Sequence, residues 1–250
     1  MQRLDLTLPT AAENVALDEA LLDWAEEDPA GREVLRIWES PQPVVVAGRS
    51  SRIAQEIDTD TCGKLGIPIV RRSSGGATIV AGPGCLMYAV VLSFQARPEL
   101  RDISLAHRFA LGRIVDALNP LIGEAGVVAC GGTSDLALTD ASPAALARKF
   151  SGNSMRVKRN HFLYHGTLLY NFNLQLLASC LRTAPRQPGY RSAREHLDFV
   201  MNVPLTRQQL LEALAMAWPT ASDLIELPTS RVAELVATRF SHDSWNLDFG

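Results

Sequence analysis

The chain has few cysteines and few lysines. Its four cysteines, Cys62, Cys85, Cys130 and Cys180, lie far apart, and no two of them form a C-x-x-C pair. This spacing argues against a zinc site built on a cysteine pair and, in a chain of 250 residues, against a disulfide framework. Of the 24 basic residues only three are lysine, so each lysine is a candidate for a specific role.

An excess of positive charge and long apolar runs are also missing. The net charge is −3 and the pI is about 6.0, so no basic field would attract nucleic acid or a membrane surface. No apolar run reaches ~18 residues, and the N-terminus lacks a charged segment followed by an apolar one. The sequence therefore predicts neither a membrane span nor a signal peptide, and we expect the protein in the cytoplasm.

Familiar nucleotide-binding fingerprints are absent as well. The chain contains no G-x-x-x-x-G-K loop, no dinucleotide fingerprint before a helix, no internal repeat and no low-complexity tract. Its composition, 47% hydrophobic and 20% charged, is that of an ordinary soluble globular protein. At 250 residues it can bury a sizeable core, in one large domain or in two small ones.

The most informative stretch is residues 69–88, IVRRSSGGATIVAGPGCLMY. Its pattern predicts a strand, a glycine turn, a strand, a tight turn and a strand. Gly75 and Gly76 permit backbone angles closed to other residues and let a ligand approach the main chain. Successive N–H groups in such a turn can bind an anion, and Arg71 and Arg72 would add charged donors. From this stretch alone, a β-hairpin turn with two solvated arginines is the simpler interpretation.

Helices and further strands are predicted around this stretch. Thr10 to Glu13 has capping-box spacing and begins an amphipathic helix, on which we expect Asp18 and Glu19 to face solvent. A helix from Ser104 is expected to stop at Asn119-Pro120. Other helices are expected at 174–181, from 206 and at 231–240, and strands at 34–38, 44–47, 127–130, 148–156 and 162–171.

Several single residues admit two interpretations. Cys130, between a strand and two glycines, is either a thiolate nucleophile whose pKa backbone amides lower or a small buried hydrophobe. Lys149 alone would most simply be solvated, and His165 a satisfied core residue. The arginine-rich segment 182–194 is either a docking loop for an acidic partner or a solvated loop.

Taken in order, several blocks form a pattern. They are NVALDEALL at 14–22, RRSSGG at 71–76, SDL at 134–136, RKFSGN at 148–153, HGTLL at 165–169 and SWNLDFG at 244–250. This pattern resembles the lipoate–protein ligase and octanoyltransferase family over nearly the whole chain. Blocks in the right order are much more specific than any one of them.

The resemblance implies an α/β fold, a mixed and largely antiparallel sheet flanked by helices, also shared with biotin ligases, and a single catalytic domain over residues 1–250. It implies transfer of a lipoyl or octanoyl group onto one lysine of a lipoyl carrier domain, in a 2-oxoacid dehydrogenase or the glycine cleavage H protein. Ligases of the family use lipoate, ATP and Mg²⁺ and pass through lipoyl-AMP, whereas transferases take the acyl group from acyl carrier protein.

The resemblance also implies roles for particular residues. Lys149 would stand beside the phosphate and the reacting carbonyl as an electrostatic stabiliser. Arg71 or Arg72, with the Gly75 and Gly76 amides, would hold the phosphate and the acyl chain. Asp135 would orient Lys149 or contact the metal and the nucleotide. The remaining residues assigned to the binding wall are Ser74, Ala77, Gly152, His165, Gly166 and Thr167.

Two departures from the family pattern bear on ATP use. Family members usually carry a third glycine and then a His-Asp pair, where this chain has Ala77 and then Val80-Ala81. The chain also ends with the catalytic domain, whereas the best-known two-domain ligases continue into a smaller domain that helps adenylate formation. A separate accessory chain, a preformed acyl-adenylate and a route without ATP are the alternatives.

Three functions compete. The first is a lipoate–protein ligase that uses Lys149 and ATP. The second is an octanoyltransferase that takes its acyl group from acyl carrier protein, with Cys130 as nucleophile and Lys149 as its activator. The third is a non-catalytic acyl- or carrier-binding relative, against which the presence of Lys149 argues. Biotin ligation is a weaker alternative, because the RRSSGG and HGTLL blocks look closer to the lipoate branch.

Overall fold

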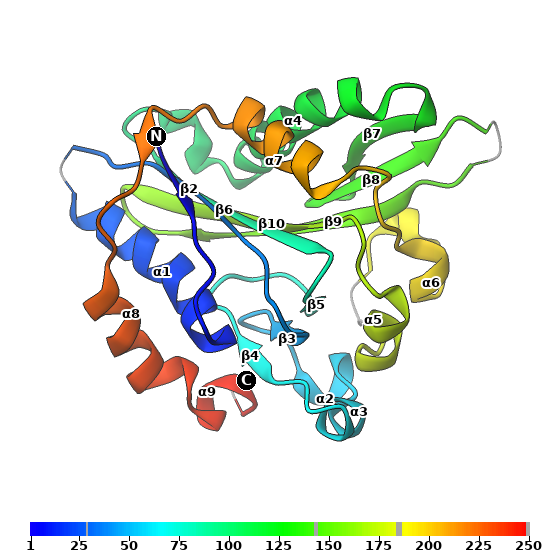
Figure 1. Ribbon diagram of the computed structural model, residues 1–250, viewed down its shortest axis with the longest axis horizontal. Coiled ribbons are helices and arrows are strands. Elements are labelled where there is room, and N and C mark those ends of the chain that lie inside the picture. The colour runs from blue at the N-terminus through cyan, green and yellow to red at the C-terminus, as the bar shows by residue number, and fades with distance from the viewer. Residues whose placement is uncertain (29, 143–144, 184–186, 249–250) are drawn as a thin grey trace.

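A computed structural model describes residues 1–28, 30–142, 145–183 and 187–248. Within these residues a long mixed sheet crosses the molecule, and helices lie on both of its faces (Figure 1). Most neighbouring strands are antiparallel. The α/β fold with a mixed, largely antiparallel sheet is confirmed. The strand order in the described residues is β11 (Ser222–Asp223), β1 (Gln2–Asp5), β2 (Val34–Trp38), β6 (Cys85–Ser93), β10 (His161–Leu169), β9 (Arg148–Val157), β8 (Asp135–Asp140), β7 (Gly126–Gly131).

Two helices, α4 (Ile103–Ile122) and α7 (Arg207–Ala217), cover the upper face of this sheet in Figure 1. The lower face is covered by α1 (Ala11–Glu27) and by a small sheet of order β4 (Ile69–Arg71), β3 (Val44–Ala47), β5 (Ile79–Ala81). The other helical segments on this side are α2 (Ile53–Glu56), α3 (Thr59–Lys64), α5 (Leu174–Cys180), α6 (His196–Phe199), α8 (Thr229–Leu235), a π-helix (Val236–Phe240) and α9 (Asp243–Asn246).

The two faces of the sheet bury separate hydrophobic clusters, and β6 contributes to both. Its successive side chains alternate, so that Met87 and Val91 pack toward α1 while Leu86 and Val90 pack toward α4 and α7. Successive side chains of a strand point to opposite faces, and both faces here are covered. This explains why the strand reads as an almost unbroken apolar run.

Residues 69–88 form strand, turn, strand, turn, strand, as predicted. The glycine turn, however, does not close a hairpin. β4 pairs with β3 in parallel and β5 pairs with β3 antiparallel, so the turn passes from one side of β3 to the other. The hairpin interpretation was wrong because the strand before the stretch, β3, lies between the two that the turn connects.

Two local predictions were wrong for tertiary reasons. Helix α4 continues through Asn119 and Pro120, and the Asn119 side chain forms two hydrogen bonds with the backbone of Val128. Asp18 and Glu19 are buried, because α1 packs against the large sheet on one side and against α8 and the π-helix on the other.

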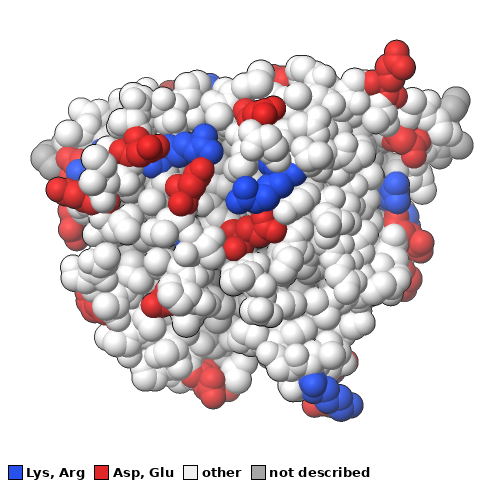
Figure 2. Space-filling view, viewed as in Figure 1, with Lys and Arg blue, Asp and Glu red and all other residues white. Residues whose placement is uncertain are grey.

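Basic and acidic side chains lie next to one another on the face shown in Figure 2. Within the described residues, no helix combines the length and the hydrophobicity needed to cross a bilayer.

Candidate functional site

Lys149 and Asp135 form an ion pair between two neighbouring strands. Its Nζ and Oδ1 atoms are 2.7 Å apart, and β8 and β9 pair antiparallel with Asp135 opposite Gly152. Lys149 and Gly152 would point to opposite faces of a regular strand, but the register shifts between Leu136 and Ala137. A bulge of this kind re-aims a side chain, and here both residues reach the same cavity.

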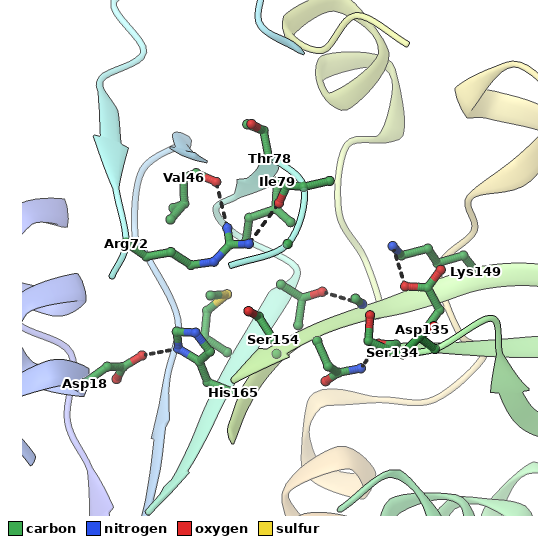
Figure 3. Close-up of a pocket in the computed structure, with 18 of the residues that line it drawn as sticks. Asp18, Val46, Arg72, Thr78, Ile79, Ser134, Asp135, Lys149, Ser154 and His165 are labelled. Carbon is green, nitrogen blue, oxygen red and sulfur yellow. Dashed lines mark hydrogen bonds and ion pairs between the residues drawn. The ribbon is translucent and has the colours of Figure 1, made fainter. Parts of the chain in front are cut away.

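That cavity has a volume of about 380 Å³ and lies on the face of the sheet that α1 covers. Lys149 and Asp135 stand at one end, and Asp18 and His165 at the other (Figure 3). The apolar part of its wall consists of Val15, Trp38, Val46, Ile79 and Met87. The predicted site residues that line it are Arg72, Gly76, Ala77, Asp135, Lys149, Gly152, His165, Gly166 and Thr167.

A smaller cavity of about 120 Å³ continues on the other side of Lys149. The two cavities share Lys149, Gly152 and Thr167, among others. The smaller one has an apolar wall with basic groups: Leu177, Leu181, Phe199, Val200, Arg182, Arg191 and His196. Lys149 thus lies at the junction of a larger and a smaller cavity.

Arg72 holds the glycine turn by its carbonyl groups. The guanidinium donates to the carbonyl oxygens of Gly75 at 2.5 Å and of Ala77 at 2.9 Å, and also to that of Val46 at 3.1 Å. Burial lowers the pKa of Arg72 to about 10, which leaves the side chain charged at neutral pH. This arginine therefore organises the turn from inside.

The turn presents backbone N–H groups that the protein does not use. Gly76 has φ +82°, and its carbonyl lies so close to Gly48 that a Cβ on Gly48 would be 1.9 Å from the oxygen. In a trans peptide the N–H points away from the C=O of the preceding residue. The peptide that contains the Gly76 N–H has the Gly75 carbonyl, which accepts from Arg72. The N–H of Gly76 therefore points away from Arg72, and in the described part of the chain the N–H groups of Gly76 and Ala77 have no acceptor. Such paired donors suit an anion.

His165, Gly166 and Thr167 lie on β10. The His165 ring bridges the Ser74 hydroxyl and the Asp18 carboxylate, at 2.6 and 3.1 Å. Gly166 leaves room for its neighbour Asn153, whose Oδ1 would lie 1.8 Å from a Cβ. The Thr167 hydroxyl accepts a hydrogen bond from the N–H of Gly152 at 3.2 Å, which fixes the strand beside Lys149.

Arg71, Ser74 and Gly75 do not line either cavity in the described residues. Arg71 is fully buried and binds the chain's own backbone, at the carbonyls of Gly48, Ser51 and Trp245 among others. The Asn246 side chain in turn accepts the N–H of Arg71. Of the two adjacent arginines, Arg72 belongs to the cavity and Arg71 braces the loop after β3 and the closing segment.

Cys130 lies on the other face of the sheet. It is directly opposite Leu136, which packs toward α4 and α7, whereas the next pair, Gly131 and Asp135, places Asp135 at the cavity. Directly opposed residues share a face and successive residues alternate. Cys130 is exposed, so the alternative of a small buried hydrophobe was wrong, while partial desolvation raises the pKa of its thiol and disfavours a thiolate. The structure therefore does not bring Cys130 together with Lys149.

Both carboxylate oxygens of Asp135 are engaged. Oδ1 pairs with Lys149, and Oδ2 accepts a hydrogen bond from the hydroxyl of Tyr190 at 2.9 Å. In the described residues, no three His, Cys, Asp or Glu side chains gather where they could hold a metal ion. Asp135 lies beside Lys149, where it was predicted, and its role as a metal ligand stays a prediction.

Tyr190, Asp18 and Asn153 were not predicted as site residues, although Asp18 and Asn153 lie in the NVALDEALL and RKFSGN blocks. Tyr190 comes from the arginine-rich segment 182–194, and its ring fits against Gly131, where a Cβ would lie 2.6 Å from the ring. Arg194 of that segment donates to the carbonyls of Ala147 and Tyr190, so its guanidinium is used within the protein. For Tyr190, the neighbouring Gly189 was the available sequence signal.

Comparison with known proteins identifies relatives. The family model of the lipoyl protein ligase A/B catalytic domain matches residues 10–217. The octanoyltransferase LipM of Carboxydothermus hydrogenoformans is 30% identical over 182 residues, which is 69% of this chain. The match spans 66% of that protein's length, just under two thirds.

Solved structures with the same fold are more distant in sequence. A putative lipoate protein ligase from Thermoplasma acidophilum with bound lipoic acid is 20% identical, with 99% of each chain covered and a TM-score of 0.79. A lipoate-protein ligase A bound with ATP is 21% identical, with 98% of each chain covered and a TM-score of 0.77. At these identities the likeness establishes the fold.

Proposed function

Because the chain belongs to the lipoyl protein ligase A/B catalytic-domain family, we propose that it attaches a lipoyl or octanoyl group to one lysine of a lipoyl carrier domain, through an acyl-adenylate made from ATP. The observation that carries this proposal is the Lys149–Asp135 ion pair at the junction of the two cavities. An activated acyl group has its reactive carbonyl between an apolar chain and a polar leaving group. In the site, Lys149 likewise lies between the larger, apolar cavity and the smaller cavity with basic groups.

The larger cavity is suited to the acyl chain. Its volume of about 380 Å³ falls within the roughly 300–1,000 Å³ of small-molecule sites, and apolar side chains from α1, β2, β3 and β6 line it. Apolar walls discriminate weakly between similar chains, since one methylene is worth about 1–3 kcal/mol. Lipoyl and octanoyl groups are therefore both admissible acyl groups.

The turn at Gly76 and the ammonium of Lys149 are suited to the phosphate and the carbonyl. The unused N–H groups of Gly76 and Ala77 would donate to the phosphate oxygens. Lys149 would stabilise negative charge on the carbonyl oxygen under attack, and Asp135 would keep its ammonium in place. The lysine amine of the carrier domain then forms the amide bond as the bond between carbonyl carbon and phosphate oxygen breaks, releasing AMP and a proton.

The smaller cavity, at about 120 Å³, would take only a part of the nucleotide. Arg182, Arg191 and His196 lie in its wall beside apolar side chains, an arrangement suited to a phosphate and a base. Asp135 would be the carboxylate beside any Mg²⁺ that accompanies ATP, and its oxygens also contact Lys149 and Tyr190. No step proposed here passes through a protein-bound metal.

Two other functions are alternatives to an ATP-dependent ligase. An ATP-independent transfer from acyl carrier protein would have to pass the acyl group directly to the acceptor lysine, since Cys130 faces away from the cavity. The LipM relative is an octanoyltransferase, which favours octanoyl transfer. A non-catalytic acyl- or carrier-binding role would leave the Lys149–Asp135 pair without a purpose.

The test is a matched pair of acylation assays on a purified lipoyl domain. One contains lipoate, ATP and Mg²⁺, and the other contains octanoyl-acyl carrier protein without ATP. We expect modification in the first assay, retained by Cys130→Ala and lost by Lys149→Ala. Modification only in the second assay would contradict the ligase proposal and indicate a transferase. Loss of that activity in Cys130→Ala would then indicate that Cys130 carries the acyl group as a covalent intermediate. No modification in either assay would overturn both enzymatic functions.

A further inference from the structure

A chain of hydrogen bonds runs along the end of the cavity remote from Lys149. Arg36, which is fully buried, pairs with Asp18 at 2.5 Å, and the other oxygen of Asp18 is 3.1 Å from Nδ1 of His165. Nε2 of His165 is 2.6 Å from the hydroxyl of Ser74, and the same hydroxyl accepts a hydrogen bond from Nε of Arg72 at 3.0 Å. The chain thus links α1, β2 and β10 to the glycine turn.

Each atom of this chain has one consistent role when His165 is neutral. Nδ1–H donates to the Asp18 carboxylate, whose other oxygen accepts from Arg36. Nε2 then accepts from the hydroxyl of Ser74, and that hydroxyl oxygen accepts from Arg72. From Asp18 to Arg72 each of these donors meets an acceptor, whereas Nε of Arg36 at the far end has none in the described residues. Satisfied donors and acceptors make a buried polar network rigid.

Ser74, His165 and Asp18 are the three residue types of a hydrolytic triad, but the serine is placed for another role. Its residue is 1% exposed and does not line the cavity, whereas His165 and Asp18 do. Arg72 also donates to its oxygen, which lowers its reactivity as a nucleophile. A serine that a substrate cannot reach acts on the protein around it.

What lies beyond Ser74 is the guanidinium that holds the turn. Arg72 uses Nε for Ser74, and one terminal nitrogen, Nη2, donates to the carbonyls of both Gly75 and Ala77. The angle of the guanidinium therefore depends on the Ser74 bond, and the direction of the Gly76 N–H depends on the guanidinium.

We propose that Asp18, His165 and Ser74 are positioning residues that fix Arg72 and, through it, aim the N–H groups of Gly76 and Ala77 at the phosphate of the activated acyl substrate. The inference rests on the proposed function, because it concerns the same substrate. It adds that one network borders both parts of the substrate: His165 and Asp18 line the acyl cavity while they hold the turn for the phosphate.

Ser74→Ala is the sharpest test, because the residue does not line the cavity. Ser73→Ala is its matched control: the neighbouring serine is also buried and has no side-chain hydrogen bond in the described residues. We expect Ser74→Ala to weaken binding of a non-hydrolysable octanoyl-adenylate analogue about tenfold by titration calorimetry and to change octanoate binding less than twofold. Ser74→Thr, which keeps the hydroxyl, should restore most of the affinity, and Ser73→Ala should bind both probes as the wild type does.

Kinetics and a second variant extend the test. The turn would hold the phosphate equally in the ground and transition states, so KM for the activated acyl substrate should rise about tenfold with kcat within threefold. Asp18 and Ser74 share no hydrogen bond, yet the effects of Asp18→Asn and Ser74→Ala on analogue binding should be strongly non-additive, because each breaks the same chain.

The outcomes separate this inference from the function on which it rests. Equal loss of octanoate and analogue binding in Ser74→Ala, or behaviour identical to Ser73→Ala, would overturn the positioning role while acylation by the wild type stands. Additive effects in the double variant would do the same. If Asp18→Asn does not fold, the Ser73 and Ser74 variants still decide. Absence of acylation by the wild type, with analogue binding that depends on Ser74, would remove the function and leave the positioning role.

Discussion

A Cβ on Gly152 would lie 2.9 Å from Nζ of Lys149 and 3.1 Å from its Cε. The ammonium therefore occupies space that only a glycine on this strand leaves open. Lys149 has a flexible side chain, so a methyl group here would displace the end of the lysine and leave the backbone where it is. The Lys149–Asp135 ion pair is therefore more sensitive to residue 152 than the fold is.

Gly152→Ala should separate activity from stability. We expect kcat/KM for acyl transfer to fall at least tenfold, because the ammonium moves away from the reacting carbonyl. The free energy of unfolding should change by less than about 1 kcal/mol, since the clash is with a flexible chain end. Denaturant unfolding and the lipoyl-domain assay measure the two. Gly112→Ala, in α4 with nothing within 4 Å of the added Cβ, is the control and should keep full activity.

Lys149→Ala should remove acyl transfer and leave the fold intact. Loss of one electrostatic donor to a developing oxyanion costs about 10²–10³ in kcat. The side chain is 27% exposed, and the strand bond from Met201 N–H to the Lys149 carbonyl does not depend on it. Lys158→Ala is the matched control, because Lys158 also pairs with an aspartate, Asp23, at 2.6 Å. Wild-type activity in Lys149→Ala would contradict the assignment.

Local patterns in the sequence predicted local structure well. The capping box at Thr10 is present, with Glu13 as its partner, and the strands within residues 69–88 lie where the turn residues indicated. Both depend on contacts between near neighbours. The burial of Asp18 could not be predicted in this way, because the side chains that face it, Arg36 on β2 and His165 on β10, are distant in the sequence.

Site residues within a sequence motif could be predicted, whereas the side of the sheet to which a residue points could not, because it depends on strand register and packing. The RKFSGN and HGTLL blocks pointed to Lys149 and His165, and both line the larger cavity. Arg71 and Arg72 could not be told apart, since adjacent residues point to opposite sides and the side depends on packing. The face on which Cys130 lies likewise needed its register with Leu136.

Tyr190→Phe tests the hydrogen bond by which Tyr190, in the arginine-rich segment 182–194, positions Asp135. The hydroxyl donates to Oδ2 of Asp135, and the ring packs on Phe199, which the substitution preserves. Loss of a hydrogen bond to a charged group costs about 1.5–3 kcal/mol where it is fully used. We expect kcat to fall about fivefold as Asp135 and Lys149 gain freedom. Tyr170→Phe removes a similar bond, to Glu39 at 2.9 Å, away from both cavities and should keep kcat unchanged.

Arg71→Met should act on stability alone. The change leaves buried carbonyls, including those of Gly48 and Ser51, without their donor, and each buried unsatisfied group costs about 1–3 kcal/mol. We expect the free energy of unfolding to fall by about 3 kcal/mol, with KM of the folded fraction unchanged. The exposed Arg207→Met, which breaks a surface pair with Glu39, should cost under about 0.5 kcal/mol. A raised KM in Arg71→Met would return Arg71 to the substrate site.

Asp18 gives the protein a defined response to acid. Burial alone would raise the pKa of this carboxyl, but Arg36 and His165 outweigh burial and lower the pKa below its usual value. A lowered pKa in the folded state means that the charged form stabilises the fold above the unfolded value of about 3.9, and that this contribution is lost as the pH falls through the folded pKa. Asp18→Asn removes it and leaves Arg36 buried without its counter-charge, at a cost of about 3–5 kcal/mol.

The free energy of unfolding of the wild type should therefore exceed that of Asp18→Asn by a constant amount between pH 5 and 7, and the difference should shrink below about pH 4 as the wild-type carboxyl takes up a proton. Urea unfolding at each pH measures this difference. Asp116→Asn, at an exposed position of α4, is the control and should follow the wild type throughout. A difference that instead grows as the pH falls from 7 to 5 would mean that the pKa of Asp18 is raised in the folded state, and that Arg36 and His165 do not outweigh its burial.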